Sequence, residues 1–462
     1  MAPARSFKEV SEYSSLLPCK QEDAEQNSDG YFAASLSSAV FNLSTSIVGA
    51  GIMGLPATMN TVGLIPGILL IIFVGYFTNY SIDYLLRYSS ASKAVSYSGV
   101  MADSFGRIGR VLLQLCIIVN NFGLLVVYLI IIADVLSGST ISSVHHSGVL
   151  EEWAGSETWW NQRTIVMLFT TVFILAPLAC VRHLVPRLGL LIRLARTRRC
   201  LFSLEGFLDI LLLGDSLELS SAVSVGLAIL FVVVTAAIFM FKLAVGTIIV
   251  PKLLPTFSLD ASTILSYFSA VPILVTAYIC HHSIHPILNE LKRPSDSTKV
   301  IRFSLGLCTS IYVTTSVFGY LLFGEDTLSD VLSNFDADLE VPHGALLSDV
   351  VRVGYAIHLM LVYPLLNFSL RLNVDGLVFP RACLLSLDNR RFYSMTFCLV
   401  AAAFLGASFV PDIWDAFQFT GSTSAVCLGF VFPGSLVLRY ISKFLCQQAL
   451  GDALTICNLN TK

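Results

Sequence analysis

The chain has 462 residues, of which 55% are hydrophobic and only 13% are charged, and its formal net charge is -3. Soluble domains carry roughly a quarter of charged residues, so this supply of charge excludes a water-facing globular surface. The basic residues are scattered over short segments and give no indication of nucleic-acid binding. The apolar residues gather in blocks of about twenty, the length that an α-helix needs to cross a bilayer. We therefore expect an all-α polytopic membrane protein embedded in lipid.

Apolar blocks bounded by charges and turn residues predict ten membrane spans. In chain order they are residues 33–57, 62–86, 111–136, 164–181, 221–247, 263–285, 303–323, 347–370, 392–410 and 413–438. A polar tail, residues 1–32, precedes the membrane domain of residues 33–440, and a second tail, residues 441–462, follows it. The ten spans predict that both tails lie on the same side of the membrane.

The positions of Lys and Arg indicate which side that is, because cytoplasmic loops hold an excess of basic residues. With the N-terminal tail in the cytoplasm, 24 of the 28 basic residues lie on the cytoplasmic side. Residues 324–346, on the opposite side, carry only acidic charges. Both tails are therefore expected to be cytoplasmic.

Two spans contain residues that interrupt a helix. Span 1 reads FNLSTSIVGAGIMGLP, with three glycines and a proline in its second half, and span 6 contains Pro272. They open two successive groups of five spans, and because five is odd, the second group enters the membrane from the opposite side. Such inverted repeats are typical of secondary transporters, whose sites lie at broken helices. Close helix packing of the GxxxG type is the alternative.

Four stretches of sequence resemble the amino acid/auxin permease family, particularly its sodium-coupled neutral amino acid transporters and plant vacuolar amino acid transporters. The stretches are FNLSTSIVGAGIMGLP, YSGVMADSFGRIGR, AYICHHSIHPILNEL and IWDAFQFTGSTSAVCLGFVFP. The resemblance extends from about residue 35 to residue 440. It implies a LeuT-like fold with a 5+5 inverted repeat, and symport of small neutral amino acids without a catalytic residue, cofactor or bound metal.

The family's substrate site is formed by the unwound parts of spans 1 and 6. The expected substrate-binding residues are Gly49, Ala50 and Gly51 in span 1, and Ser269, Ala270 and Val271 in span 6. A helix broken in span 1 exposes N–H donors for the substrate carboxylate at the start of its second half. Carbonyl groups freed ahead of Pro272 would face the substrate ammonium. The scarcity of charge within the spans suits a zwitterion.

The coupling cation is expected to be a proton, or the transport to be independent of sodium. Sodium-coupled relatives place an asparagine at the position of Thr45 and a threonine at about the position of Val362. Valine supplies no oxygen to replace the water around a sodium ion. A proton needs only one titratable side chain, and His281 is the nearest candidate in the sequence. Thr45 and His281 are therefore the expected cation-coupling residues.

The sequence departs from the family pattern in two places. Residues 184–214 form an atypical insertion on the cytoplasmic side between spans 4 and 5, and we interpret them as a retained-intron product rather than an amphipathic surface helix. The family's usual eleventh span is missing. An inactive splice product and a non-transporting amino-acid sensor are therefore alternative interpretations.

A membrane metalloenzyme is a more remote alternative. His281, His282 and His285 resemble one histidine box of the di-iron desaturases, which need several such boxes on one side.

The cellular location rests on a short signal. In the N-terminal tail, Glu12 followed by Leu16 and Leu17 resembles a dileucine sorting signal. That signal predicts a vacuole or another internal membrane rather than the plasma membrane.

Overall fold

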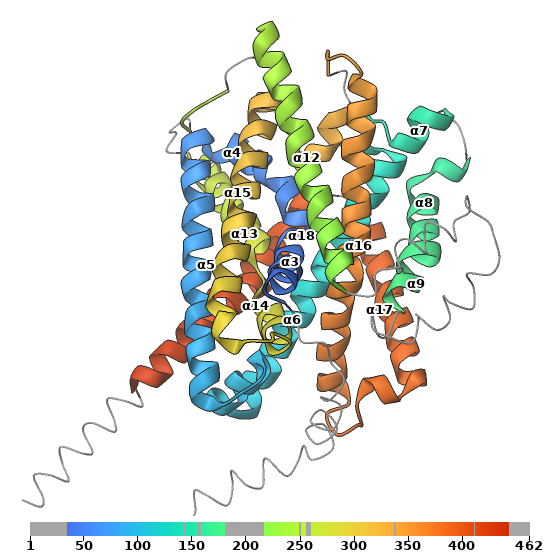
Figure 1. Ribbon diagram of the computed structural model, residues 1–462. Coiled ribbons are helices and arrows are strands. Elements are labelled where there is room, and N and C mark those ends of the chain that lie inside the picture. Colours follow the sequence, from blue (N-terminus) through green and yellow to red (C-terminus); the bar gives the residue numbers. More distant parts are fainter. Residues whose placement is uncertain are drawn as a thin grey trace, which may run out of the picture.

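The computed structural model describes residues 35–141, 144–155, 159–180, 217–248, 251–255, 260–336, 339–410 and 412–442. In these residues the protein is a bundle of helices with one two-stranded sheet (Figure 1). The expected insertion at residues 184–214 and the sorting signal lie outside the described residues, as does most of the C-terminal tail.

The first half of the bundle contains the helices of the first five predicted spans. They are α3 (Leu36–Ile47), η2 (Ala50–Gly54) and α4 (Leu55–Val62); α5 (Leu64–Ser92); α6 (Tyr97–Ser137); α8 (Arg163–Thr170), η4 (Thr171–Leu175) and α9 (Ala176–Ala179); and α12 (Leu217–Val245). Between α6 and α8 lie β1 (Ser139–Ile141), β2 (Val144–His146), α7 (Val149–Ala154) and η3 (Trp159–Asn161). Strands β1 and β2 pair antiparallel, with Thr140 opposite His145.

The second half contains the helices of the remaining five predicted spans. They are α13 (Ala261–Tyr278) and α14 (His281–Asn289); η5 (Pro294–Asp296), α15 (Ser297–Phe323), η6 (Gly324–Asp326) and η7 (Val331–Asp336); α16 (Gly344–Val378); η8 (Leu385–Leu387) and α17 (Asn389–Phe409); and α18 (Ile413–Thr420), η9 (Gly421–Ala425) and η10 (Cys427–Val431). Helical backbone continues from η10 to Ser442.

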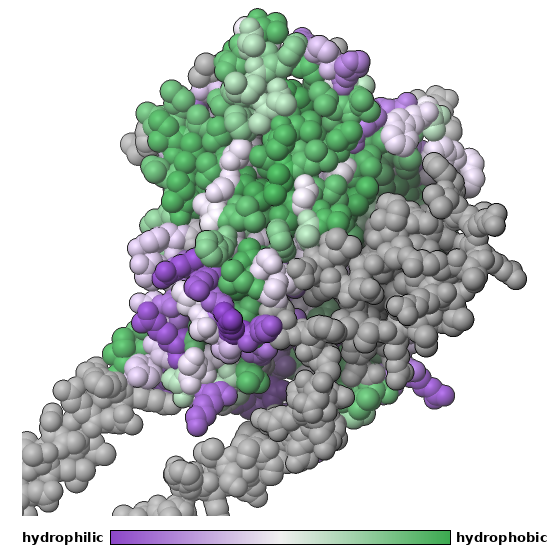
Figure 2. Space-filling model, in the orientation of Figure 1, coloured by the Kyte–Doolittle hydropathy of each residue, from purple (hydrophilic) through white to green (hydrophobic). Residues whose placement is uncertain are grey.

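Eight of the described helices are long and apolar enough to cross a membrane. The bent pair Leu36–Ile47 and Ala50–Val62 would form a ninth span, and residues Arg163–Ala179 form a shorter apolar helix. Figure 2 shows apolar side chains over the upper part of the bundle and hydrophilic ones gathered below them. Large apolar side chains that are exposed include Phe73, Phe77, Phe241 and Phe303. The protein is therefore a polytopic helical membrane protein, as predicted.

Local sequence sets the helix boundaries. Ser35 caps α3 by accepting a hydrogen bond from Ser38 N, and Ser96 caps α6 by accepting one from Gly99 N. Helix α6 begins earlier than residue 111, the predicted start of span 3, and it bends at Gly106, whose φ is +66°. Glycine adopts this left-handed conformation without the steric penalty of other residues.

Helix α16 lies at the centre of the bundle. It packs against α6 on one side and α12 on the other, while α3 packs against both α12 and α15. The largest fully buried side chains include five tyrosines, at positions 278, 312, 320, 355 and 363. Buried tyrosines fill space as an apolar residue does, but each also brings a hydroxyl group into the interior.

The break in span 6 differs from the prediction. Helix α13 continues through Pro272 to Tyr278, and the backbone leaves the helical conformation at Ile279 and Cys280. A proline removes only one helical hydrogen bond, and packing in a bundle can keep the helix intact around it. Here η9 covers the proline closely, because a Cβ atom added to Gly421 would collide with the Pro272 carbonyl. The interpretation that Pro272 breaks span 6 was therefore wrong.

A network of ion pairs closes the outer end of the bundle, opposite the predicted cytoplasmic side. Arg352 of α16 is only 2% exposed, and its guanidinium group lies 2.6 Å from Glu152 Oε2 and 3.0 Å from the carbonyl oxygen of Ser147. His146 of β2 lies 3.0 Å from Asp336 Oδ2 at the end of η7. The segment between α6 and α8 is therefore fastened to the second half of the chain.

The contact between spans 1 and 6 generates a prediction about stability. A Cβ atom added to Gly51 would lie 2.7 Å from the Cα atom of Ala277, so Gly51→Ala is expected to lower the free energy of unfolding by about 1–3 kcal/mol through overpacking. Because the collision is with backbone, the second substitution Ala277→Gly should not restore stability. Gly226→Ala is the matched control, since nothing lies within 4 Å of that position. Thermal unfolding of the purified protein measures the stability of all three variants. A Gly51→Ala variant as stable as the wild type would contradict the close contact with Ala277.

Candidate functional site

The candidate site is built around the interruption of span 1. Between α3 and η2, Val48 has φ/ψ of -75°/103° and Gly49 has -144°/-148°, so neither residue is helical. The two halves of the span are bent by 51°. The break predicted at Gly49 is therefore observed. Gly51 and Ala50 belong to the short turn η2 that starts the second half.

Side chains from spans 7 and 8 donate hydrogen bonds to the backbone oxygens at the break, where the Gly49 oxygen also accepts from Ile52 N at 3.4 Å. The Ile47 oxygen accepts a hydrogen bond from Tyr312 Oη at 2.7 Å, the Val48 oxygen from His358 Nε2 at 3.1 Å, and the Gly49 oxygen from Tyr355 Oη at 2.7 Å. All three donors are fully buried. Water does not reach such a site freely, and a buried backbone oxygen without a donor costs free energy. These donors therefore stabilise the interruption in an apolar interior.

The break in span 6 lies beside the break in span 1. Tyr312 Oη is also 2.7 Å from the carbonyl oxygen of Ala277, which precedes the non-helical Ile279 and Cys280. The phenol has one proton, so it donates to Ile47 or to Ala277 at any moment but not to both. One hydroxyl group from span 7 therefore joins the two interrupted helices.

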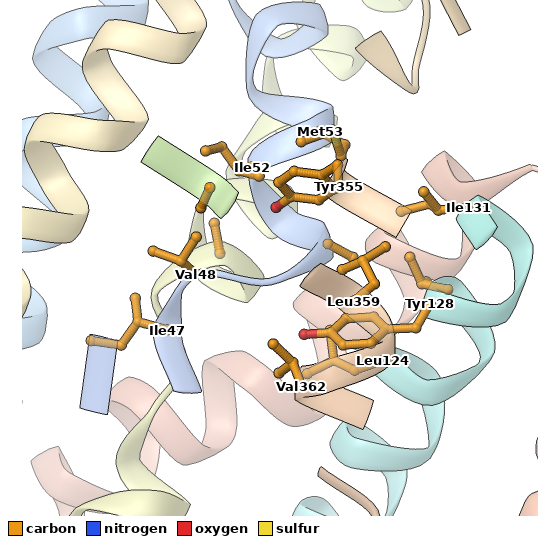
Figure 3. Packing of buried hydrophobic residues seen from close by; sticks show 14 of the residues in the cluster. Ile47, Val48, Ile52, Met53, Leu124, Tyr128, Ile131, Tyr355, Leu359 and Val362 are labelled. Atoms are coloured by element: carbon orange, nitrogen blue, oxygen red, sulfur yellow. The ribbon is translucent and has the colours of Figure 1, made fainter. Parts of the chain in front are cut away.

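The glycines of span 1 are required by close packing. A Cβ atom at Gly49 would collide with the hydroxyl group of Tyr128, and one at Gly51 would collide with the backbone of Ala277. Figure 3 shows Tyr128 of α6 and Tyr355 of α16 beside the interrupted segment, with their hydroxyl groups directed towards it. The predicted residues of span 1 thus lie at the crossing point of several helices.

The three predicted residues of span 6 are placed differently from the expectation. Ser269, Ala270 and Val271 are helical, and the Ser269 hydroxyl donates to the Ser266 oxygen at 2.7 Å. They lie before Pro272, in the part of α13 that stays intact. The prediction named them because of that proline, whereas the break falls at Ile279 and Cys280, which carry no sequence signal of their own.

The two predicted cation-coupling residues are both buried. Thr45 Oγ1 donates to the Ser221 oxygen of α12 at 3.0 Å. His281 Nε2 lies 3.0 Å from Ser81 Oγ, whose own proton goes to the Gly429 oxygen, so the histidine is the donor in this contact. Thr45 therefore joins span 1 to span 5, whereas His281 joins the start of α14 to α5.

A cavity of about 480 Å³ opens at the predicted cytoplasmic end of the bundle. It is lined by residues of α5, α14 and the segment that follows α14, among them Ser89, His285 and Asn289. His285 Nε2 is 3.0 Å from Ser89 Oγ. The Arg352 network lies at the opposite end of the bundle.

The histidine cluster of α14 does not form a metal centre with other described residues. Within the described ranges, no group of three or more His, Cys, Asp or Glu side chains is placed to hold a metal ion. His281 and His285 form hydrogen bonds with serines of α5 instead.

The sequence analysis did not single out the polar side chains that reach the break, which are Tyr312, Tyr355 and His358. The sequence feature that could have identified them is a polar group inside an apolar span.

Comparisons with known proteins relate the chain to amino acid transporters. A family profile described as "Transmembrane amino acid transporter protein" matches residues 33–187 and 214–452. The chain is 49% identical over 425 residues to "Amino acid transporter AVT6A" of Arabidopsis thaliana, covering 92% of this chain and 85% of that protein. It is also 49% identical over 429 residues to "Amino acid transporter AVT6B" of the same plant, covering 92% of this chain and 87% of that protein. Both breaks lie within the matched ranges.

The shared hydroxyl group of Tyr312 generates a second prediction. Tyr312→Phe leaves buried backbone oxygens without a donor, so we expect it to lower the free energy of unfolding by about 1–3 kcal/mol. Tyr363→Phe is the matched control, because its buried hydroxyl group has no hydrogen-bond partner among the described residues. Thermal unfolding should therefore separate the two variants. Equal stability of the two variants would show that the bridge between the breaks contributes nothing.

Proposed function

The chain belongs to the transmembrane amino acid transporter family, and we propose that it carries small neutral amino acids across a membrane by proton-coupled or sodium-independent secondary transport. The observation that carries this proposal is the pair of adjacent breaks in spans 1 and 6, joined by Tyr312. A free amino acid presents a carboxylate and an ammonium group. Two neighbouring helix breaks offer backbone N–H groups and carbonyl oxygens for both of them.

The surroundings of the breaks favour a substrate with no net charge. The side chains that hydrogen-bond the broken backbone are two tyrosines and a histidine, and no Asp, Glu, Lys or Arg is among these partners in the described part of the chain. A substrate with an extra charge would leave that charge unpaired in an apolar interior, at a high cost in free energy.

The position of the breaks also supports a 5+5 inverted repeat with alternating access. Spans 1 and 6 are the first of each group of five, and each is interrupted. In such folds one group of helices rocks against the other around a site at mid-membrane depth. The closed Arg352 network and the cavity at the opposite end would then belong to a state that opens towards the cytoplasm.

The residues at the expected sodium positions favour independence from sodium. Val362 is buried and contributes no oxygen, while the Thr45 hydroxyl group donates its proton to Ser221 of α12. Sodium gives up its water only when several oxygen ligands replace it. His281, buried beside Ser81, is the proton carrier that the sequence alone suggests.

An amino-acid sensor or an inactive product is the alternative function. A sensor would use the same breaks to bind the substrate without moving it. Saturable binding by the purified protein, without any uptake into vesicles, would favour that alternative.

Uptake into proteoliposomes tests the transport proposal. Labelled neutral amino acid should enter saturably, uptake should persist when choline replaces sodium, and it should increase with an imposed pH gradient. Gly49→Ala should abolish uptake, since the added Cβ atom collides with the Tyr128 hydroxyl group. Protein-free vesicles are the control. Strict dependence on sodium at every pH would refute the coupling proposal while leaving amino acid transport in place.

The location proposal has its own test. If the acidic dileucine sequence ending at Leu16 and Leu17 directs the protein to the vacuole or another internal membrane, a tagged double variant with alanine at both positions should move to the plasma membrane. A double variant at Ser14 and Ser15 is the matched control. Unchanged location of the leucine variant would remove this argument for an internal membrane.

A further inference from the structure

His358 occupies an unusual position in the interior. It lies on α16 with no exposed surface, and each of its two ring nitrogens faces a backbone oxygen. Nε2 lies 3.1 Å from the oxygen of Val48 in the break of span 1, and Nδ1 lies 2.8 Å from the oxygen of Ser224 on α12. The ring therefore connects spans 1, 5 and 8 at the candidate site.

Hydrogen-bond chemistry limits the protonation states that fit these contacts. A carbonyl oxygen can only accept, and a neutral imidazole has only one N–H group. Both carbonyl contacts of His358 are satisfied together only when the ring is doubly protonated. The Ser224 hydroxyl group is 2.9 Å from Nδ1 and can donate to that nitrogen when the ring is neutral. Ser224 thus supplies a partner for either state, its hydroxyl for the neutral ring and its carbonyl for the charged ring.

The groups around His358 do not neutralise a charge on it. Tyr355, on the same helix, has its ring 4.8 Å from the imidazole, and Tyr128 of α6 and Tyr312 of α15 are the other titratable groups around the break. From α3 and α12 the described contacts of the ring are the Val48 backbone and Ser224. Among the described residues, no Asp or Glu side chain hydrogen-bonds to His358 or forms an ion pair with it.

A buried positive charge with no counter-charge is costly, so a proton on His358 needs a negative partner. The carboxylate of an amino acid bound at Gly49, next to Val48, would be that partner. Proton and substrate would then stabilise each other, which is the thermodynamic requirement for coupling their movement.

We propose that His358, held between the Val48 and Ser224 backbone oxygens, is the residue that binds the transported proton. This role rests on the proposed transport function and replaces His281 as the proton carrier. The proton binds at Nδ1 from one side of the membrane together with the substrate, and the same nitrogen releases it to the other side.

The test uses the full-length protein in vesicles that contain a trapped pH dye. Wild-type protein should admit protons together with a neutral amino acid, and a gradient of about one pH unit should drive about tenfold accumulation for one proton per substrate. His358→Gln keeps an N–H donor for Val48 but cannot titrate. It should lose proton entry and gradient-driven accumulation of the substrate.

Two histidines provide comparisons. His282→Gln is the matched control, because it is a buried histidine whose ring nitrogens have no hydrogen-bond partner among the described residues, and its coupling should be unchanged. His281→Gln tests the rival carrier. Retained coupling in His358→Gln, or loss of coupling in His281→Gln alone, would overturn the assignment. Wild-type vesicles that exchange no neutral amino acid would overturn the transport proposal itself, and the assignment with it.

Ser224→Ala covers the case in which His358→Gln fails to fold or to exchange substrate. It removes the donor of the neutral ring and keeps the carbonyl oxygen that faces the charged ring. The pH at which uptake is half-maximal should therefore rise relative to wild type. Ser221→Ala, whose buried hydroxyl group has no partner among the described residues, should leave that pH unchanged. An unshifted profile for Ser224→Ala would count against His358.

Discussion

The interruption of a helix inside an apolar bundle is the constraint on which the rest of the structure depends. Once span 1 leaves the helical conformation at Val48 and Gly49, the backbone oxygens of Ile47 and Val48 need other donors, which an apolar interior does not supply by itself. The chain must provide donors from other helices. The interior of the bundle consequently holds buried polar side chains among its apolar ones.

Those donors determine which helices surround the site. Tyr312 comes from span 7, and Tyr355 and His358 come from span 8, so these two spans must lie against span 1 with defined faces. Because the Tyr312 hydroxyl group also reaches Ala277, the break of span 6 is held beside that of span 1. The same contacts that stabilise the broken backbone thus bring together the two halves of the chain.

Close backbone approach makes this arrangement possible and also restricts it. Gly49 leaves room for the Tyr128 hydroxyl group, and Gly51 allows the backbone of span 1 to approach Ala277. Hydrogen bonds to carbonyl oxygens are short-range and directional, so a shift of one helix would break several of them at once. The Arg352 network and the cavity beside His285 lie at opposite ends of the bundle.

The sequence by itself determined the membrane class, the family and the break at Gly49, because segment length, charge placement and glycine clusters act locally along the chain. It placed the second break at Pro272, but the helix continues through this proline, which lies against Gly421. Only the tertiary structure decided that the break falls at Ile279 and Cys280, and that Tyr312, Tyr355 and His358 serve the site. Their partners lie far away in the sequence, and hydrogen bonding across helices depends on how helices are placed, which no local pattern encodes.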